Sequence, residues 1–401
     1  MLTYNDLTNA CSPGGASVLT SVTELQAAAG THASVAPAKF VDRNGSVFAF
    51  ETRFIDGEPA EVVLIDSKQS TLNRGEAAVS QDVHASHPVM SRIPRIEVDY
   101  GDGKVLSDLD LPHRFADGHI RAGRIDGQPA TQNEQYRAVR NSSPADASAL
   151  LNTAPTALVL GGWDASRKSN QLRLRSALVG EIIGVLADQT VPGKEQQSRR
   201  GGARVDALAM SVQLAPGDLD ALVDAQENEL SPKLVEKLRT EVKKAKKGDQ
   251  LSGANLGLGG IPPTLESLGG VSCRRIIRSW VLSFATLRQL RFGGSADADV
   301  AGRALLAAYG LAILARAEQE LYLRANCDLV ESSAPVVSID ERHGAKRSLD
   351  PLTVEAADKL LLEAINAAEG LGVAEWRGQV LHVDGEPAIL GGAVGLDVDE
   401  D

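Results

Sequence analysis

Cysteine and aromatic residues are scarce in this sequence, and each shortage excludes a class of protein. Three cysteines, Cys11, Cys273 and Cys327, lie far apart in 401 residues and form no C-x-x-C pair. They exclude a disulfide scaffold and a cysteine-based zinc site, and they favour a reducing, cytoplasmic setting. Aromatic residues make up 4% of the chain, so an aromatic sheet that reads bases in the usual way is not expected.

Several catalytic and targeting motifs are also missing. The sequence has no G-x-S-x-G elbow, phosphate-binding Walker loop or H-E-x-x-H pair. Its longest apolar run, residues 304–315, is shorter than the roughly 20 residues that a membrane span needs. No basic stretch followed by an apolar stretch opens the chain, so we expect no signal peptide and no membrane partner.

Metal and cofactor sites are not predicted either. Four histidines, His84, His87, His113 and His119, fall within a short span, but their spacing is common by chance and they are interpreted as surface or hydrogen-bonding groups. The glycines at 257–260 are followed by Pro262 and Pro263, which prevent the helix that a dinucleotide-binding loop requires.

Apolar periodicity and turn residues predict short strands and helices that alternate. The predicted strands cover 46–54, 61–66, 158–160, 205–214 and 379–386, with a β-hairpin over 92–109 whose tip is at 101–103. The predicted helices cover 21–29, 67–79, 176–188, 218–247 with a break at 231–232, 272–291, 300–321 and 353–369. Residues 189–204 and 248–270 are expected to be loops.

This order suits an α+β fold with a ferredoxin-like βαββαβ core and large insertions. We expect an N-terminal extension over 1–39 and a single domain over 40–390. That domain carries an insertion at 189–270, and an acidic, solvated tail follows over 391–401.

The start of the predicted helix at 67–79 is a candidate binding site. It offers Ser67, Gln69, Ser70, Asn73 and Arg74, and a helix N-terminus adds free N–H groups and a positive dipole. These groups suit a phosphodiester backbone. An equally good interpretation of the same residues is a solvated helix face. Asp66 is interpreted as the helix N-cap rather than as a metal ligand or base.

The second candidate is a glycine-rich loop with an excess of basic residues. Residues 161–176 contain Arg167, Lys168, Arg173 and Arg175 against one acid, Asp164. Extended to Arg204, the segment has eight Lys and Arg against four Asp and Glu, in a chain of net charge −12. Local positive charge on an acidic protein favours a polyanionic ligand. Trp163 and Tyr322 are the only aromatics beside such loops.

A third basic segment, residues 271–291, contains five arginines and no acid. Its apolar residues fit one face of a helix, so its arginines, among them Arg274, Arg278, Arg288 and Arg291, are interpreted as structural or subunit contacts.

Several ordered stretches resemble a known family. They are VLIDSKQSTLNRGEAA (63–78), DLPHRFADGHIR (110–121), LVLGGWDASRKSNQLRLRSALVGEIIG (158–184), ARVDALAM (203–210), NLGLGGIPP (255–263), VLSFATLRQLRFG (281–293) and LYLRANCDLV (321–330). Together they resemble the Csb-one family, the Cas-seven-type backbone subunit of type I-G (formerly I-U) CRISPR effector complexes. Gly75 departs from the family pattern, which has an acid after N-R.

The resemblance implies a modified RRM fold of the RAMP type with a thumb, formed by the hairpin 92–109 or the insertion. It implies a non-enzymatic subunit of Cascade that polymerises along CRISPR RNA and presents the guide to target DNA in antiviral defence. Further copies, other Cascade subunits and a recruited helicase–nuclease are the implied protein partners, with no cofactor. The expected RNA-binding residues are Ser67, Gln69, Ser70, Asn73, Arg74, His113, Arg114, Arg121, Arg167, Lys168, Arg173, Arg175, Arg204 and Asn255.

Two alternatives stay open at this point. One is a metal-dependent RNase of RAMP descent that uses Asp66 or the His84/His87 pair on guide-bound RNA. The other is an α+β protein whose negative surface binds a protein partner.

Overall fold

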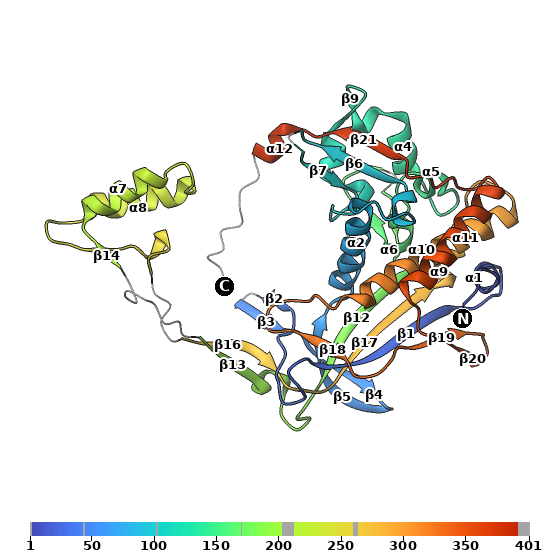
Figure 1. Ribbon diagram of the computed structural model, residues 1–401, viewed down its shortest axis with the longest axis horizontal. Coiled ribbons are helices and arrows are strands. Elements are labelled where there is room, and N and C mark those ends of the chain that lie inside the picture. Colours follow the sequence, from blue (N-terminus) through green and yellow to red (C-terminus); the bar gives the residue numbers. More distant parts are fainter. Residues whose placement is uncertain are drawn as a thin grey trace. The chain divides into compact units, whose positions relative to one another are not determined.

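Two compact units make up the chain in a computed structural model that describes residues 2–42, 45–101, 103–169, 171–202, 212–259 and 264–391. Unit 1 comprises Met1–Gln196 and Val271–Asp401, and unit 2 comprises Gln197–Gly270 (Figure 1). Unit 2 falls entirely inside the insertion that the sequence predicts at 189–270.

An antiparallel sheet of eight strands is the centre of unit 1. Seven strands follow the order β20-β19-β1-β17-β12-β5-β4, and β18 pairs with β1. Their bounds are β1 Val18–Ala27, β4 Phe50–Ile55, β5 Glu58–Asp66, β12 Leu178–Leu186, β17 Cys273–Ser283, β18 Leu329–Glu331, β19 Val336–Asp340 and β20 Lys346–Leu349. A separate hairpin joins β2 (Lys39–Asp42) to β3 (Gly45–Phe48).

Long helices cover one face of this sheet (Figure 1). They are α2 (Lys68–His84), α10 (Ala296–Gln319) and α11 (Val354–Gly370), and α1 (Tyr4–Cys11) packs on α10. α10 is long and apolar enough to span a membrane, but 89% of its apolar window is buried inside the protein. It is therefore the core helix of the fold.

The connectivity of the central strands is that of the predicted βαββαβ core. The sheet order β19-β1-β17-β12 places the first strand between the fourth and the third, with α2 between β1 and β12 and α10 between β17 and β19. The α+β, ferredoxin-like fold class is thus confirmed, and β4, β5 and unit 2 are additions to it.

A second sheet, in the order β7-β6-β21-β8-β9, contains the predicted hairpin. β6 (Arg95–Asp99) pairs with β7 (Val105–Ser107) and, in parallel, with β21 (Val380–Asp384). The remaining elements of unit 1 are α3 Gly118–Ala122, β8 Arg124–Ile125, β9 Gln128–Pro129, α4 Glu134–Asn141, α5 Ser148–Leu151, α6 Thr156–Leu160, β10 Gly162–Trp163, β11 Arg173–Leu174, α9 Phe284–Leu287, α12 Pro387–Gly391 and the short 3-10 turns η1 Met90–Arg92, η2 Arg114–Ala116, η3 Ala130–Gln132 and η4 Gly193–Gln196.

Unit 2 is a two-stranded ribbon that carries a pair of helices. β13 (Gln197–Gly202) pairs with β16 (Thr264–Val271), and β14 (Gln213–Leu214) pairs with β15 (Leu251–Ser252). α7 (Pro216–Gln226) and α8 (Pro232–Lys244) bury Leu219, Val223 and Leu238 between them, as the sequence predicts for 218–247 with a break at Ser231-Pro232.

Three predicted helices are strands in the structure. Residues 21–29 lie largely in β1, 176–188 in β12 and 272–291 mainly in β17. In β1 and β17 the inward positions alternate as in any strand, but they include Ser21, Thr23 and Arg278, which hide the apolar alternation. β12 is buried on both faces over 182–186, so its apolar run imitates a helix.

Other local predictions are also corrected. Residues 158–160, predicted as a strand, end α6, and the predicted loop 248–270 contains β15 and most of β16. The strand predicted at 205–214 lies mostly outside the described residues, and only β14 falls within them.

Asp108 provides a test of how the core of unit 1 responds to pH. It is 1% exposed, its Oδ1 accepts the N–H of Ile96, and its Oδ2 has no hydrogen-bond partner. Burial, together with repulsion from Glu76, raises the pKa of Asp108 from 3.8 to about 7. The folded state therefore binds more protons than the unfolded state between these two values, so stability falls as the pH rises through this window.

We expect Asp108→Asn to remove this dependence, which amounts to at most about 1.4 kcal/mol per pH unit. Urea unfolding at pH 5, 6, 7 and 8 measures the slope. Asp126→Asn, which removes an exposed carboxyl from the turn after β8, controls for loss of charge. Equal slopes in wild type and Asp108→Asn would contradict the assignment.

Candidate nucleic-acid interface

A β-hairpin displays the basic loop predicted by the sequence. β10 and β11 pair Gly162 with Leu174 and Trp163 with Arg173, and residues 164–172 connect them. Gly161 has a φ of +87°, and a Cβ there would lie 2.7 Å from Ser176 Oγ, so only glycine fits at the base of the hairpin. We call residues 161–175 the basic loop.

Trp163 and three cations form the exposed surface of the basic loop. Trp163 is 54% exposed, although large apolar side chains are normally buried. The guanidinium of Arg173 lies 5.3 Å from the centre of its indole ring. Lys168, Arg173 and Arg175 are exposed. The hairpin therefore offers a stacking surface and positive charge together, a combination that suits single-stranded nucleic acid.

Buried Asp164 holds the basic loop in one conformation. Its carboxylate accepts two hydrogen bonds from the Arg140 guanidinium of α4, at 2.8 and 3.1 Å. Ser166 Oγ donates to the same carboxylate, and Arg121 of α3 donates to Ser166 Oγ at 2.6 Å. The only acid in this loop is therefore paired internally with Arg140, and its negative charge does not neutralise the exposed cations.

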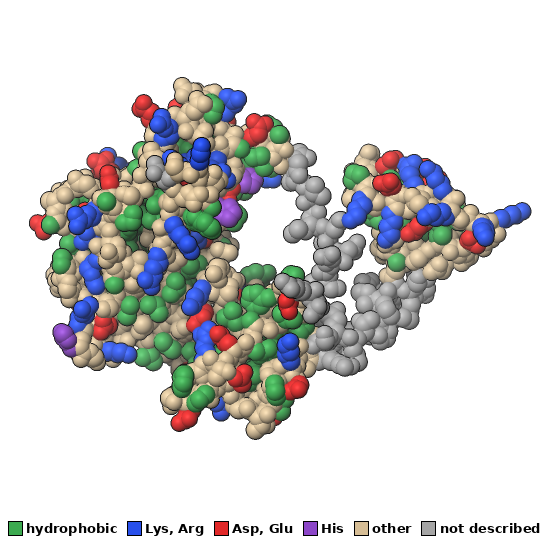
Figure 2. Space-filling model, turned by 180° about the vertical axis from the view of Figure 1, so that it is seen from behind, with side chains coloured by type: hydrophobic (Ala, Val, Ile, Leu, Met, Phe, Trp, Pro, Cys, Tyr) green, Lys and Arg blue, Asp and Glu red, His purple; other side chains and the backbone are tan. Residues whose placement is uncertain are grey.

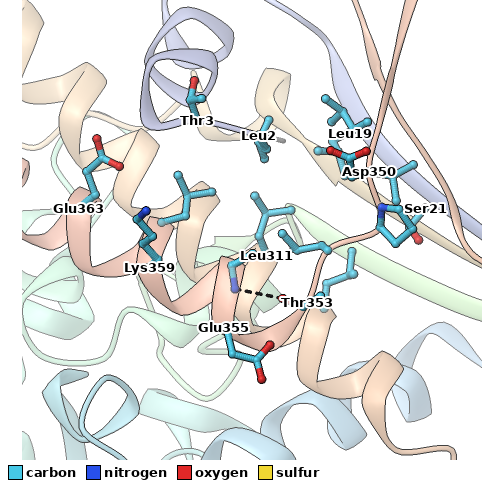
Figure 3. Close-up of a pocket in the computed structure, with 17 residues that line it drawn as sticks. Leu2, Thr3, Leu19, Ser21, Leu311, Asp350, Thr353, Glu355, Lys359 and Glu363 are labelled. Atoms are coloured by element: carbon cyan, nitrogen blue, oxygen red, sulfur yellow. Dashed lines mark hydrogen bonds between the residues drawn. The ribbon is translucent and has the colours of Figure 1, made fainter.

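An open hollow lies beside the loop. Its volume is about 540 Å³, and four of its lining side chains are cations, with Thr131 and two serines between them. We call it the basic hollow, and it is lined by Gly118, Arg121, Ala122, Thr131, Arg140, Ser166, Arg167, Lys168 and Ser169. Lysine and arginine side chains lie on the surfaces of both units (Figure 2).

Two of the predicted RNA-binding residues in 113–121, Arg114 and Arg121, contact the basic loop, although neither is fully exposed. Arg114 donates to both carboxylate oxygens of Glu76 in α2 and to the carbonyl of Gly161, so it anchors the hairpin from within. Burial raises the pKa of Glu76 against the opposing effect of Arg114. His113 is exposed, and Arg121 is half-buried beneath the hollow.

The start of α2 is only partly available for binding. Gln69 and Asn73 are exposed, whereas Arg74 turns inward to Asp66 and Ser70. Burial and nearby Arg324 lower the pKa of Arg74 to about 10, so it stays charged at neutral pH. The prediction that Asp66 is the N-cap is wrong: Ser67 caps the helix, since its Oγ accepts the N–H of Ser70 at 3.2 Å.

Asp66 is instead a fully buried anchor. It accepts a 2.8 Å hydrogen bond from Thr71 Oγ1 and pairs with Arg74 and Arg324. The histidines predicted as hydrogen-bonding groups include His87, whose Nδ1 accepts backbone N–H groups, and His119, which meets Tyr100 Oη at 2.5 Å. Across the described ranges, no group of three or more His, Cys, Asp or Glu is placed to hold a metal ion.

The other predicted residues fall elsewhere. Asn255 is exposed in unit 2, and Arg204 lies outside the described residues. Arg167 donates to the Arg140 carbonyl and to Asn141, so part of its role is structural. Arg140 and Thr131 were missed, because nothing in the sequence links α4 or η3 to a loop more than twenty residues away.

Part of the chain that contains this site matches a known protein family. Residues 19–189 match the family described as CRISPR-associated protein GSU0053. This match covers 171 of the 401 residues, and over that range the chain is similar to a CRISPR-associated protein family. No curated protein matches the chain. The matched range covers α2, α3, α4 and the whole basic loop, and this similarity supports a role in CRISPR defence.

Asp164 gives a direct test of the loop's internal support. Asp164→Ala leaves the Arg140 guanidinium, whose side chain is 11% exposed, without its counter-charge, and we expect a loss of about 3–5 kcal/mol in unfolding free energy. Replacing both partners, with Asp164→Leu and Arg140→Met, should cost clearly less. Urea unfolding measures both, and acrylamide quenching of Trp163 reports on the loop. Equal costs for the single and double variants would show that the pair is not coupled.

Proposed function

We propose that this CRISPR-associated protein is a non-catalytic, guide-RNA-binding backbone subunit of a type I-G effector complex. In this role, copies line up along the CRISPR RNA and leave its bases available to pair with target DNA. The observation that carries the proposal is the basic loop: an exposed tryptophan and exposed cations on a hairpin fixed by a buried ion pair, beside a cationic hollow.

The open face of the main sheet does not offer an equivalent surface. Two of its outward arginines are engaged by acids: Arg53 pairs with Glu51 and Glu181, and Arg275 pairs with Glu24 and Asp56. An RRM normally stacks bases on aromatic residues of this face. The charge pattern therefore favours RNA at the basic loop rather than across the sheet.

Unit 2 is the better candidate for the thumb. The alternative, the hairpin β6–β7, is integrated into a five-stranded sheet through β21. Unit 2 is instead a separate compact body on the β13–β16 ribbon, and its helix α8 ends in Lys243 and Lys244. Helix α8 has five Lys and Arg against two Glu, and a basic helix carried on a ribbon suits a part that crosses a polyanion.

The non-catalytic part of the proposal draws support from Asp66. Its carboxylate is fully buried between two guanidinium groups, so it is poorly placed to bind a metal ion or to accept a proton from water. Incubating the assembled complex with complementary RNA and Mg²⁺ or Mn²⁺ tests this point. Regularly spaced cuts that disappear with Asp66→Ala would overturn it.

Removing the exposed cations of the loop should weaken RNA binding and its dependence on salt. For Lys168→Ala/Arg173→Ala/Arg175→Ala, we expect the slope of log K against log salt to flatten by about 2, since each phosphate contact on a single strand contributes roughly 0.7. The matched control is Lys346→Ala/Lys359→Ala/Arg377→Ala, which removes three exposed cations from β20, α11 and the loop after it. Filter binding from 50 to 500 mM salt measures the slopes. Equal slopes for the two triple variants would exclude the loop as the RNA site.

Trp163 should contribute by stacking. Trp163→Ala is expected to weaken single-stranded RNA binding by about 1–3 kcal/mol, whereas Trp163→Phe keeps much of the affinity because it retains an aromatic face. Fluorescence anisotropy with a single-stranded oligonucleotide and with the same sequence in a duplex separates stacking from charge. If the alanine variant weakens both ligands equally, stacking is not the source of the loss.

A further inference from the structure

Charge in the basic hollow is only partly balanced by the residues around it. Arg140 is neutralised by Asp164, but among the described residues Arg121 and Lys168 form no ion pair with a carboxylate. Arg121 donates to the Ala116 carbonyl and to Ser166 Oγ, both uncharged, and Lys168 is exposed. The hollow therefore presents a positive field in a protein whose net charge is −12.

The sequence also contains a segment of opposite charge that has no role in the proposed function. Residues 392–401, GAVGLDVDED, contain no Lys or Arg and carry four acids: Asp397, Asp399, Glu400 and Asp401. Leu396 and Val398 alternate with the first of these acids. A run of closely spaced negative charges resembles the phosphates of a nucleic acid strand in the property that a cationic hollow recognises.

The strand β21, which precedes the last described helix α12, pairs with an element that adjoins the hollow. Asp384, the last residue of β21, pairs with Arg124 of β8, and Gly385 N donates to the Asp99 carbonyl. β8 directly follows α3, whose Gly118, Arg121 and Ala122 line the hollow. His119, on the same helix, contacts Tyr100. Ten further residues span up to roughly 33–36 Å when extended, and this length sets the reach of residues 392–401 from Gly391.

We propose that the acidic segment 392–401 docks in the basic hollow of its own chain and competes there with the phosphates of RNA. This inference rests on the proposed function only for the identity of the competing ligand. A short tether gives an effective concentration on the order of 1 mM, so a segment with an intrinsic Kd of about 0.1 mM occupies the hollow most of the time. RNA that engages many phosphates at once displaces it, whereas a short or weakly held polyanion does not.

The central experiment neutralises the segment without shortening it. Asp397→Asn/Asp399→Asn/Glu400→Gln/Asp401→Asn should tighten binding of a short single-stranded RNA about tenfold at 50 mM salt, and the difference should vanish near 500 mM salt because the contact is screened. As a matched control, four exposed acids of unit 2 (Asp218, Glu229, Glu236 and Asp249) are neutralised in the same way. An equal gain in the control would reduce the effect to net charge and overturn the proposal.

A second measurement does not depend on RNA. A labelled peptide of residues 387–401 should bind the neutralised protein in a fluorescence anisotropy titration and should lose affinity with Lys168→Ala or Arg121→Gln. Lys168 is exposed, so its variant is expected to fold normally. A peptide that binds equally to all these proteins, or to none, would overturn the proposal.

The two measurements separate this inference from the proposed function. If the peptide binds but no variant binds RNA, the proposed function fails and the docking contact stands. If RNA binds all variants alike and the peptide does not bind, the docking contact fails alone. Light scattering of the unmodified chain decides between docking within one chain and docking between copies: association lost on neutralisation would overturn the intramolecular arrangement.

Discussion

Pairing of buried carboxylates with arginine is the interaction on which the rest of unit 1 depends. Asp66, Glu76, Asp164 and Asp358 are each less than a tenth exposed, and each meets at least one guanidinium group. Apart from Asp66–Arg74, these pairs join elements that are separated in sequence: Arg316 ties α10 to Asp358 of α11 and to Asp82 of α2. Removing one partner strands a charge in a low-dielectric interior, so these pairs fix how the helices meet the sheet.

The same constraint divides the arginines into two groups. Arg74, Arg114, Arg140, Arg278 and Arg316 are committed to internal acids, and their charge is not available to a ligand. In the basic loop, the one acid, Asp164, is already paired with Arg140. Lys168, Arg173 and Arg175 are therefore not neutralised by it and stay exposed. A local excess of arginine in the sequence is therefore not sufficient evidence for a binding surface. A basic binding surface forms where arginines and lysines outnumber the acids that lie close enough to pair with them.

Much of the fold follows from local patterns, and the exceptions have identifiable physical causes. Periodicity predicts α10 and α11, turn residues predict the hairpin β6–β7, and Ser231-Pro232 marks the start of α8. β1 and β17 resist prediction because their buried face is polar in the middle. There Ser21 Oγ donates to Glu318, and Arg278 pairs with Glu331 and donates to Thr23 Oγ1. Likewise, charge composition predicts the basic loop, but the contribution of Arg140 depends on a tertiary contact that no local pattern encodes.

The chemistry of the interface also limits what it can read. Cations contact phosphates, which are identical in every nucleotide, and an indole ring stacks on any base. The exposed side chains of the basic loop are mainly of these two kinds, together with small groups such as Ser169 and with Gln171, whose amide N–H groups are taken by the carbonyls of Ala165 and Arg167. Discrimination between bases requires paired donors and acceptors held against base edges, as in bidentate contacts of arginine, asparagine or glutamine. A surface that gains affinity from backbone charge and stacking accepts any sequence, and this is the property that the proposed guide-binding role requires.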